Sequence, residues 1–234
     1  MQTCDSQSGL CTISSSDAKE GSLKLDRAEL FYVGDPMCSW CWGMSKELKQ
    51  IQELCTKKSI KFSVVLGGLR IGGGDEWNEQ FKSFLKNEWQ NIHQRTNQKF
   101  VYTLLELKEF NYDTEPACLG VYIAKKILQS KDDNSATVLA FFSKIQEKFY
   151  AKGLNPTKLE FYHDICKEFG ISIDEFENYF HSKEMREELR GDFELAGKLG
   201  ARGMPSLIYV KESSIAGSSS GYATYEDILK MLGV

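Results

Sequence analysis

Two cysteines separated by two residues, Cys38 and Cys41, lie in the stretch DPMCSWCWG. They follow a short apolar run and open a segment with helical spacing. Unpaired N–H groups and the dipole at a helix start favour negative charge, so we expect the Cys38 thiol to have a pKa below the free value of about 8.5. Cys41, one turn further on, can then attack a mixed disulfide at Cys38. The pair predicts thiol–disulfide exchange.

Two other interpretations of the pair are open. Cysteines are often small buried residues at a helix start. A zinc site would need Cys4 and Cys11 as well, but the six residues between them exceed the usual spacing of two to four. The position directly after a strand and Pro36 favours the redox pair, and no metal is expected.

Composition limits the class of protein. A chain of 234 residues, 41% hydrophobic, is long enough to bury one substantial core. The net charge of −4 favours neither nucleic acid nor an anionic membrane as a partner. Residues 1–27 lack a secretory signal pattern and no apolar run spans a bilayer, so we expect a cytoplasmic protein. In a reducing compartment, seven cysteines do not suggest a structural disulfide framework.

The order of predicted elements indicates an α/β fold with a helical insertion. We expect a flexible tail at 1–27, a strand in AELFYVG, one helix from Cys38 to about Cys55, and a strand in IKFSVVL. Helical spacing then dominates, and SLIYV and SIAGS follow as a hairpin before a closing helix. The prediction is a thioredoxin-type domain at 28–74 and 200–234, with an all-helical insertion at 75–199.

Four motifs occur in the order of a known family: DPMCSWCWG, LGGLRIGGG, YDTEPACLGVYIAKK and LGARGMPSLIYV. The chain resembles the DsbA-like thioredoxin-fold proteins of the FrnE type over roughly residues 28–232. Members are similar to disulfide oxidoreductases and isomerases with a helical insertion. The resemblance implies that Cys38 is the nucleophile and Cys41 the resolving thiol.

The resemblance also implies a cis-proline loop opposite the cysteines, at Met204-Pro205. Its exposed backbone would pair with an extended substrate segment; from the sequence alone, a trans proline at an edge strand is the alternative. Ser39 and Trp40 complete the expected substrate-binding residues, with Trp40 and Trp42 as an apolar rim around the sulfur. Related enzymes often hold a buried acid where this chain has Tyr32. The proton acceptor for the resolving step is then water or Asp35.

The remaining cysteines fall into two groups. Cys55, Cys118 and Cys166 lie on apolar helical stripes and are predicted to be core residues. Cys4 and Cys11 are either exposed thiols of the tail or a second redox pair that exchanges with the first.

We therefore expect a thiol–disulfide oxidoreductase or isomerase acting on cysteine-containing proteins or small thiols, with an unknown redox-recycling partner. No cofactor beyond the cysteine pair is expected, with glutathione as a possible co-substrate. The alternative is a redox-sensitive thioredoxin-fold adaptor or binding protein without turnover. A relative of the kappa-type glutathione transferases or isomerases would share the plan, but that group tends to use serine where Cys38 stands.

Overall fold

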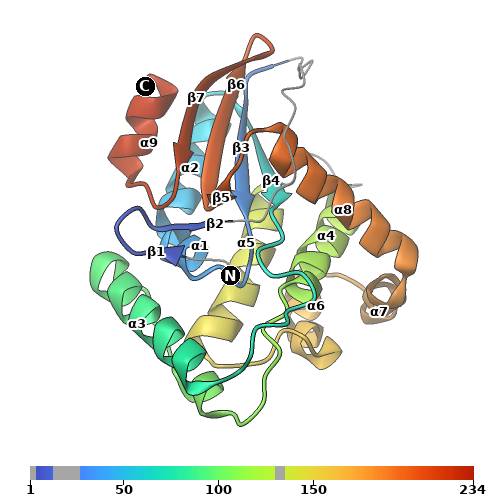
Figure 1. The fold of residues 1–234 in the computed structure, drawn as a ribbon. Coiled ribbons are helices and arrows are strands. Elements are labelled where there is room, and N and C mark those ends of the chain that lie inside the picture. Colours follow the sequence, from blue (N-terminus) through green and yellow to red (C-terminus); the bar gives the residue numbers. More distant parts are fainter. Residues whose placement is uncertain (1–3, 13–26, 130–134) are drawn as a thin grey trace.

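The computed structural model describes residues 4–12, 27–129 and 135–234 (Figure 1). A central four-stranded sheet has the order β4-β3-β6-β7. Its strands are β3 (Glu29–Gly34), β4 (Lys61–Leu66), β6 (Ser206–Lys211) and β7 (Ser214–Ser220). The β3–β4 pair is parallel, as a helical crossover requires, and the other pairs are antiparallel. The predicted strands and the late hairpin are confirmed.

The crossover between β3 and β4 differs from the single predicted helix. It consists of α1 (Ser39–Gly43) and α2 (Ser45–Lys57), separated at Met44, whose ψ of 0° departs from helical geometry. Gly43 weakens the helix at this point, and a Cβ added to it would lie 2.9 Å from Ile92. The glycine therefore ends α1 and lets a neighbouring helix approach closely.

The helices between β4 and β6 lie below the sheet and to its right in Figure 1. Packing of α5 against both α2 and β4, and of α8 against β4, joins this helical part to the sheet. The division into domains at 75 and 199 stays a prediction, although every helix from α3 to α8 falls between those positions. The elements are α3 (Glu79–Thr96), η1 (Thr103–Glu106), α4 (Glu115–Gln129), α5 (Ser135–Gln146), η2 (Glu147–Ala151), η3 (Leu159–Tyr162), α6 (His163–Glu168), α7 (Ile173–His181) and α8 (Lys183–Lys198), with α9 (Tyr225–Leu232) closing the chain.

The N-terminal residues correct one prediction. Residues 4–12 contain β1 (Cys4–Asp5) and β2 (Leu10–Thr12), and β2 pairs antiparallel with β5 (Gly203–Met204) in a second small sheet. The flexible-tail prediction for 1–27 is therefore wrong for these residues, because the free edge of β5 supplies backbone partners that composition does not reveal. Residues 13–26 lie outside the described part. Within the described ranges, no helix has both the length and the apolar character needed to cross a bilayer.

Candidate active site

The two cysteines of the CSWC stretch lie side by side at the start of α1. Cys38 is the N-cap residue, and its N–H donates to the carbonyl oxygen of Asp35 at 3.0 Å. Cys41 follows one helical turn later, close enough to raise the pKa of Cys38. Both are free thiols and both are fully buried. The sulfurs are thus close enough for one to replace the other in a disulfide exchange.

The pKa of Cys38 differs from the sequence-based expectation. It is raised well above its ordinary value, first by burial and then by the hydrogen bond with Cys41. The Cys38 thiol also lies 3.7 Å from the carbonyl oxygen of Met204, to which it donates. Removal from water disfavours the thiolate more than a helix of five residues favours it. The expected low pKa is therefore wrong for this covered state of the site.

The Met204-Pro205 peptide bond is cis, as the family resemblance implied. Met204 lies in β5 and is fully buried. A Cβ at Gly67 would lie 2.2 Å from the Met204 sulfur, so glycine at 67 makes room for this bulky side chain. The loop backbone is not exposed as predicted, because Met204 pairs with Cys11 in β2.

The turn between β1 and β2 lies on the ring of Trp40. Gly9 has φ +66°, and a Cβ there would lie 2.8 Å from that ring. The Trp40 indole N–H donates to Glu88 at 3.3 Å, and the same carboxylate accepts from the hydroxyl of Ser6. Arg95 lies 5.4 Å above the Trp40 ring and donates to the carbonyl oxygen of Gln7 at 3.0 Å. The hairpin formed by residues 4–12, here called the N-terminal hairpin, therefore covers the cysteines.

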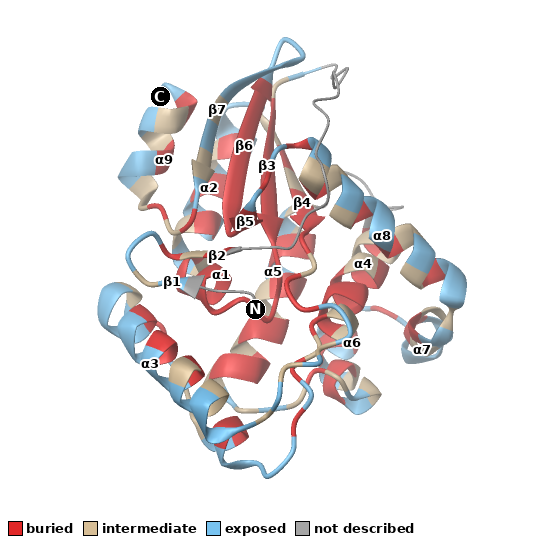
Figure 2. Cartoon of the chain, viewed as in Figure 1, coloured by how far each residue is buried: buried red, intermediate tan, exposed pale blue. Residues whose placement is uncertain are grey.

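The N-terminal hairpin leaves the expected substrate-binding residues buried rather than accessible. Trp40 is fully buried rather than an open rim, and Ser39 and Trp42 are 7% and 8% exposed. Figure 2 shows α1 buried beneath β1 and β2. Cys11 is itself 1% exposed and is disulfide-bonded. Substrate binding by Ser39, Trp40, Met204 and Pro205 stays a prediction.

A buried carboxyl group lies directly behind the cysteine pair. Asp35 accepts from the backbone N–H groups of Met37 at 2.8 Å and Leu69 at 2.7 Å. The Cys118 thiol donates to the same carboxylate at 3.3 Å. Burial raises the pKa of Asp35, and the backbone hydrogen bonds oppose that rise. The sequence left water or Asp35 as the proton acceptor, and a buried carboxyl group in this position can accept or hold a proton.

Tyr32, which replaces the acid common in related enzymes, is also fully buried. Its pKa is raised, first by burial and then by the neighbouring Cys41. The hydroxyl makes no hydrogen bond within the described part of the chain. A group with such a raised pKa stays protonated at neutral pH, so Tyr32 does not replace the missing acid as a proton acceptor.

The three cysteines predicted to be core residues are buried as expected: Cys55 in α2, Cys118 in α4 and Cys166 in α6. Burial raises the pKa of Cys55 to about 11, and chiefly burial raises that of Cys166 to about 12. Cys118 is a core residue too, but its bond to Asp35 connects it to the site. Helical spacing predicts burial and cannot reveal this contact, since Asp35 lies on a different element.

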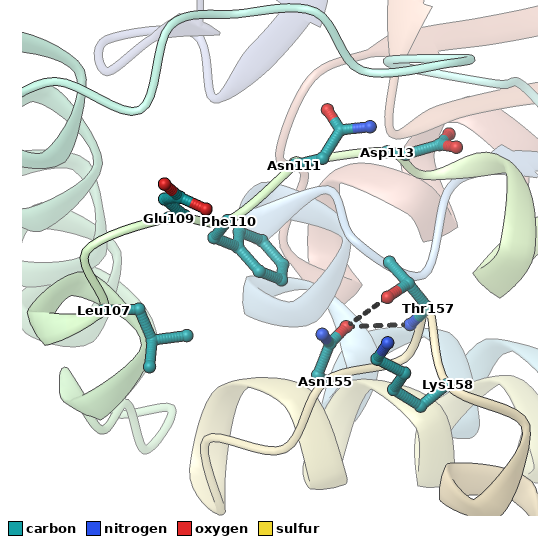
Figure 3. Close-up of a pocket in the computed structure, with 8 residues that line it drawn as sticks. All are labelled: Leu107, Glu109, Phe110, Asn111, Asp113, Asn155, Thr157 and Lys158. Atoms are coloured by element: carbon teal, nitrogen blue, oxygen red, sulfur yellow. Dashed lines mark hydrogen bonds between the residues drawn. The ribbon is translucent and has the colours of Figure 1, made fainter.

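No cluster of three or more His, Cys, Asp or Glu side chains with metal-binding geometry occurs among the described residues. A polar pocket of about 390 Å³ lies between residues 107–113 and 155–158 (Figure 3). Its lining contains no cysteine, and Asn155 there accepts two hydrogen bonds from Thr157. We assign no function to it.

Fold and site together define a thioredoxin-type protein with a DsbA-like arrangement of helices. The family model described as Thioredoxin matches residues 31–228, and the chain belongs to that family.

Its relatives include a structure from Nitrosomonas europaea described as a "putative protein disulfide isomerase", 26% identical, covering 89% of this chain and 97% of the other, with a TM-score of 0.77. The cytosolic disulfide reductase DsbM from Pseudomonas aeruginosa, also solved with GSH, is 21% identical and has a TM-score of 0.60. The match covers 80% of this chain and 87% of DsbM. The ClpXP adapter protein SpxH of Halalkalibacterium halodurans is 21% identical over 90% of this chain and 67% of its own length.

Proposed function

We propose that this protein is a thiol–disulfide oxidoreductase or isomerase in which Cys38 is the nucleophile and Cys41 the resolving thiol. The observation that carries the proposal is the placement of two buried thiols one helical turn apart at the start of α1, with the Cys38 thiol donating to the carbonyl oxygen of Met204. Relatives described as a disulfide reductase and a disulfide isomerase support this class of reaction. A FrnE-like subclass and a cytoplasmic location stay predictions.

The exchange proceeds in two displacements. The Cys38 thiolate attacks one sulfur of a substrate disulfide, that S–S bond breaks, and the second substrate sulfur leaves as a thiolate that takes a proton. Cys41 then loses its proton and attacks the Cys38 sulfur. The mixed disulfide breaks, the first substrate sulfur leaves, and the Cys38–Cys41 disulfide remains. The reverse sequence oxidises a substrate dithiol.

Asp35 is our proposed acceptor for the Cys41 proton. Its carboxyl group acts on Cys38 electrostatically, and burial raises its pKa toward that of a useful base. Glutathione is the proposed small-thiol co-substrate, supported by the GSH complex of DsbM. The protein clients and the recycling partner would be other cysteine-containing proteins.

The test is a redox titration of the purified protein in glutathione buffers, read by thiol alkylation and mass spectrometry. We expect a reversible Cys38–Cys41 disulfide with a defined midpoint. Cys38→Ser should abolish it, a Cys4→Ser/Cys11→Ser double variant should retain it, and Cys55→Ser, a buried cysteine away from the pair, should leave it unchanged. If no such disulfide forms at any glutathione ratio, the proposal is wrong.

The adaptor function is the second candidate, because SpxH is described as a ClpXP adapter. An adaptor needs a binding surface but no turnover. Partner capture that survives Cys38→Ser, together with no disulfide exchange in the wild type, would favour this alternative.

A further inference from the structure

The N-terminal hairpin brings a disulfide to the strand beside Cys38. Cys11 is disulfide-bonded, and Cys4 lies opposite it in the antiparallel register of β1 and β2. Cys11 in turn lies opposite Met204 in the register of β2 and β5. The Met204 carbonyl oxygen accepts from Cys38. One residue, Met204, is thus the neighbour of both the Cys11 disulfide and the Cys38 thiol.

An extended peptide that adds to a free sheet edge gains backbone hydrogen bonds and a fixed register. β2 occupies the edge of β5 in this manner. A Cβ at Gly203 would lie 2.4 Å from the carbonyl oxygen of Cys11, which shows how closely the two backbones approach. The chain's own strand therefore fills the position proposed for an external substrate.

The hairpin is held by specific contacts with α3 and with the segment between β7 and α9. Ser6 donates to Glu88 and Gln7 accepts from Arg95, both on α3. The backbone N–H of Tyr222 donates to the carbonyl oxygen of Ser8 at 3.1 Å. Arg95 lies 4.7 Å from the Tyr222 ring, which packs against Trp40 of α1. These contacts fix the register that places Cys11 next to Met204.

We propose that the Cys11 disulfide, with Cys4 assigned as its other half from the register, is an internal redox partner of Cys38 and Cys41. This inference rests on the proposed thiol–disulfide function. Cys38 loses its proton and its sulfur attacks the Cys11 sulfur, the bond to Cys4 breaks, and Cys4 leaves as a thiolate that takes up a proton. Cys41 then attacks Cys38, releasing Cys11 as a thiol. The Cys38–Cys41 pair is oxidised by two electrons and the Cys4–Cys11 pair is reduced by two.

Proximity gives this exchange a kinetic advantage over external disulfides. Linking two groups on one chain replaces a collision between molecules with an effective concentration far above that of an external reactant. Because Cys11 and Cys38 are both buried, competing reactants are excluded while the hairpin is seated. The hairpin would thus relay electrons between the buried pair and outside thiols.

The test uses full-length double variants that leave one thiol from each pair. In Cys4→Ser/Cys41→Ser, Cys11 and Cys38 should form an intramolecular disulfide under mild oxidation with oxidised glutathione, at a rate independent of protein concentration. Peptide mapping identifies the linkage. The matched variants Cys4→Ser/Cys38→Ser and Cys11→Ser/Cys41→Ser should form far less, because Cys41 lies one turn further along α1 than Cys38 and Cys4 lies one strand further from β5 than Cys11. Adding Gly9→Val, which places a side chain against Trp40, should suppress the Cys11–Cys38 linkage.

The relay would be overturned if folded Cys4→Ser/Cys41→Ser protein formed glutathione adducts or intermolecular dimers and no Cys11–Cys38 disulfide. Folding is checked by circular dichroism and urea unfolding. In the wild type, a Cys4–Cys11 disulfide that stays oxidised while Cys38–Cys41 titrates would overturn it as well. The Cys4→Ser/Cys11→Ser variant separates the two proposals, since failure of its Cys38–Cys41 disulfide would refute the enzyme and not only the relay.

Discussion

The Cys118 thiol donates a hydrogen bond to the carboxylate of Asp35, with 3.3 Å between Sγ and Oδ2. The two residues come from different parts of the fold, α4 and the turn after β3. Both are fully buried, and burial raises the pKa of each. A carboxyl group so placed has different pKa values in the folded and the unfolded chain. Its effect can therefore be measured as a pH dependence of the free energy of unfolding.

Asp35 should make the folded protein less stable as pH rises. Its pKa in the folded protein is above the ordinary value of 3.8. At pH values between 3.8 and the folded pKa, the folded state therefore binds more protons than the unfolded state. The free energy of unfolding contributed by Asp35 is therefore highest below 3.8 and falls as pH rises through the folded pKa. Denaturant unfolding of wild type and Asp35→Asn across this pH range provides the test. The difference between their free energies of unfolding should shrink or change sign as pH rises.

Asp227 provides a control of opposite sign. Its carboxylate accepts from the hydroxyl and the backbone N–H of Thr224 at the start of α9, and these hydrogen bonds lower its pKa. Its contribution should grow as pH rises through its folded pKa. Equal pH slopes for Asp35→Asn and Asp227→Asn would contradict the assignment of Asp35 as a buried group with a raised pKa.

Two buried tyrosines should respond in opposite directions to loss of the hydroxyl. Tyr32→Phe removes a hydroxyl without a hydrogen bond in the described chain, so the free energy of unfolding should rise by about 1 kcal/mol. The Tyr162 hydroxyl donates to the carbonyl oxygen of Pro156 at 2.6 Å and lies 3.0 Å from that of Pro116. Tyr162→Phe should lower the same quantity by about 1–3 kcal/mol. Urea unfolding at neutral pH measures both, and a destabilised Tyr32→Phe would show that its hydroxyl has an important partner.

The sheet and the position of the cysteine pair could be predicted from the sequence because they depend on local patterns. Alternation marks β4, and the turn at Gly34-Asp35-Pro36 marks the end of β3. The contact between Asp35 and Cys118 could not be predicted, since it depends on how α4 packs. The same holds for the N-terminal hairpin: CDSQSGLC is polar, and its strands exist because β5 offers a backbone edge. Burial of Cys38 follows from that hairpin, which is why the expected low pKa was wrong.

Gly67 and Met204 should be energetically coupled. A Cβ at Gly67 would lie 2.2 Å from the Met204 sulfur, so Gly67→Ala overpacks the core and should cost about 1–3 kcal/mol. Met204→Ala leaves a cavity and should cost about 2–5 kcal/mol. The double variant should cost less than the sum, because each change relieves the other. Urea unfolding of the four proteins gives the coupling, and simple additivity would contradict the contact.

The N-terminal hairpin should control the reactivity of Cys38. Gly9→Val clashes with Trp40 and strains a backbone at φ +66°. Displacing the hairpin admits water to Cys38, which favours the thiolate and lowers its pKa. Because thiolate is the attacking form and its population at neutral pH grows about tenfold for each pKa unit lost, alkylation of Cys38 should accelerate.

The measurement is the rate of Cys38 alkylation by iodoacetamide between pH 6 and 10, followed by mass spectrometry. Gly170→Val is the matched control, with φ +65° and no neighbour within 4 Å of the added Cβ. It carries similar backbone strain at the end of α6 and should leave the Cys38 profile as it is in the wild type. Identical profiles for both variants would mean that the hairpin does not limit access to Cys38. A rate profile shifted to lower pH only in Gly9→Val would establish that the seated hairpin, rather than the helix start, sets the protonation of this thiol.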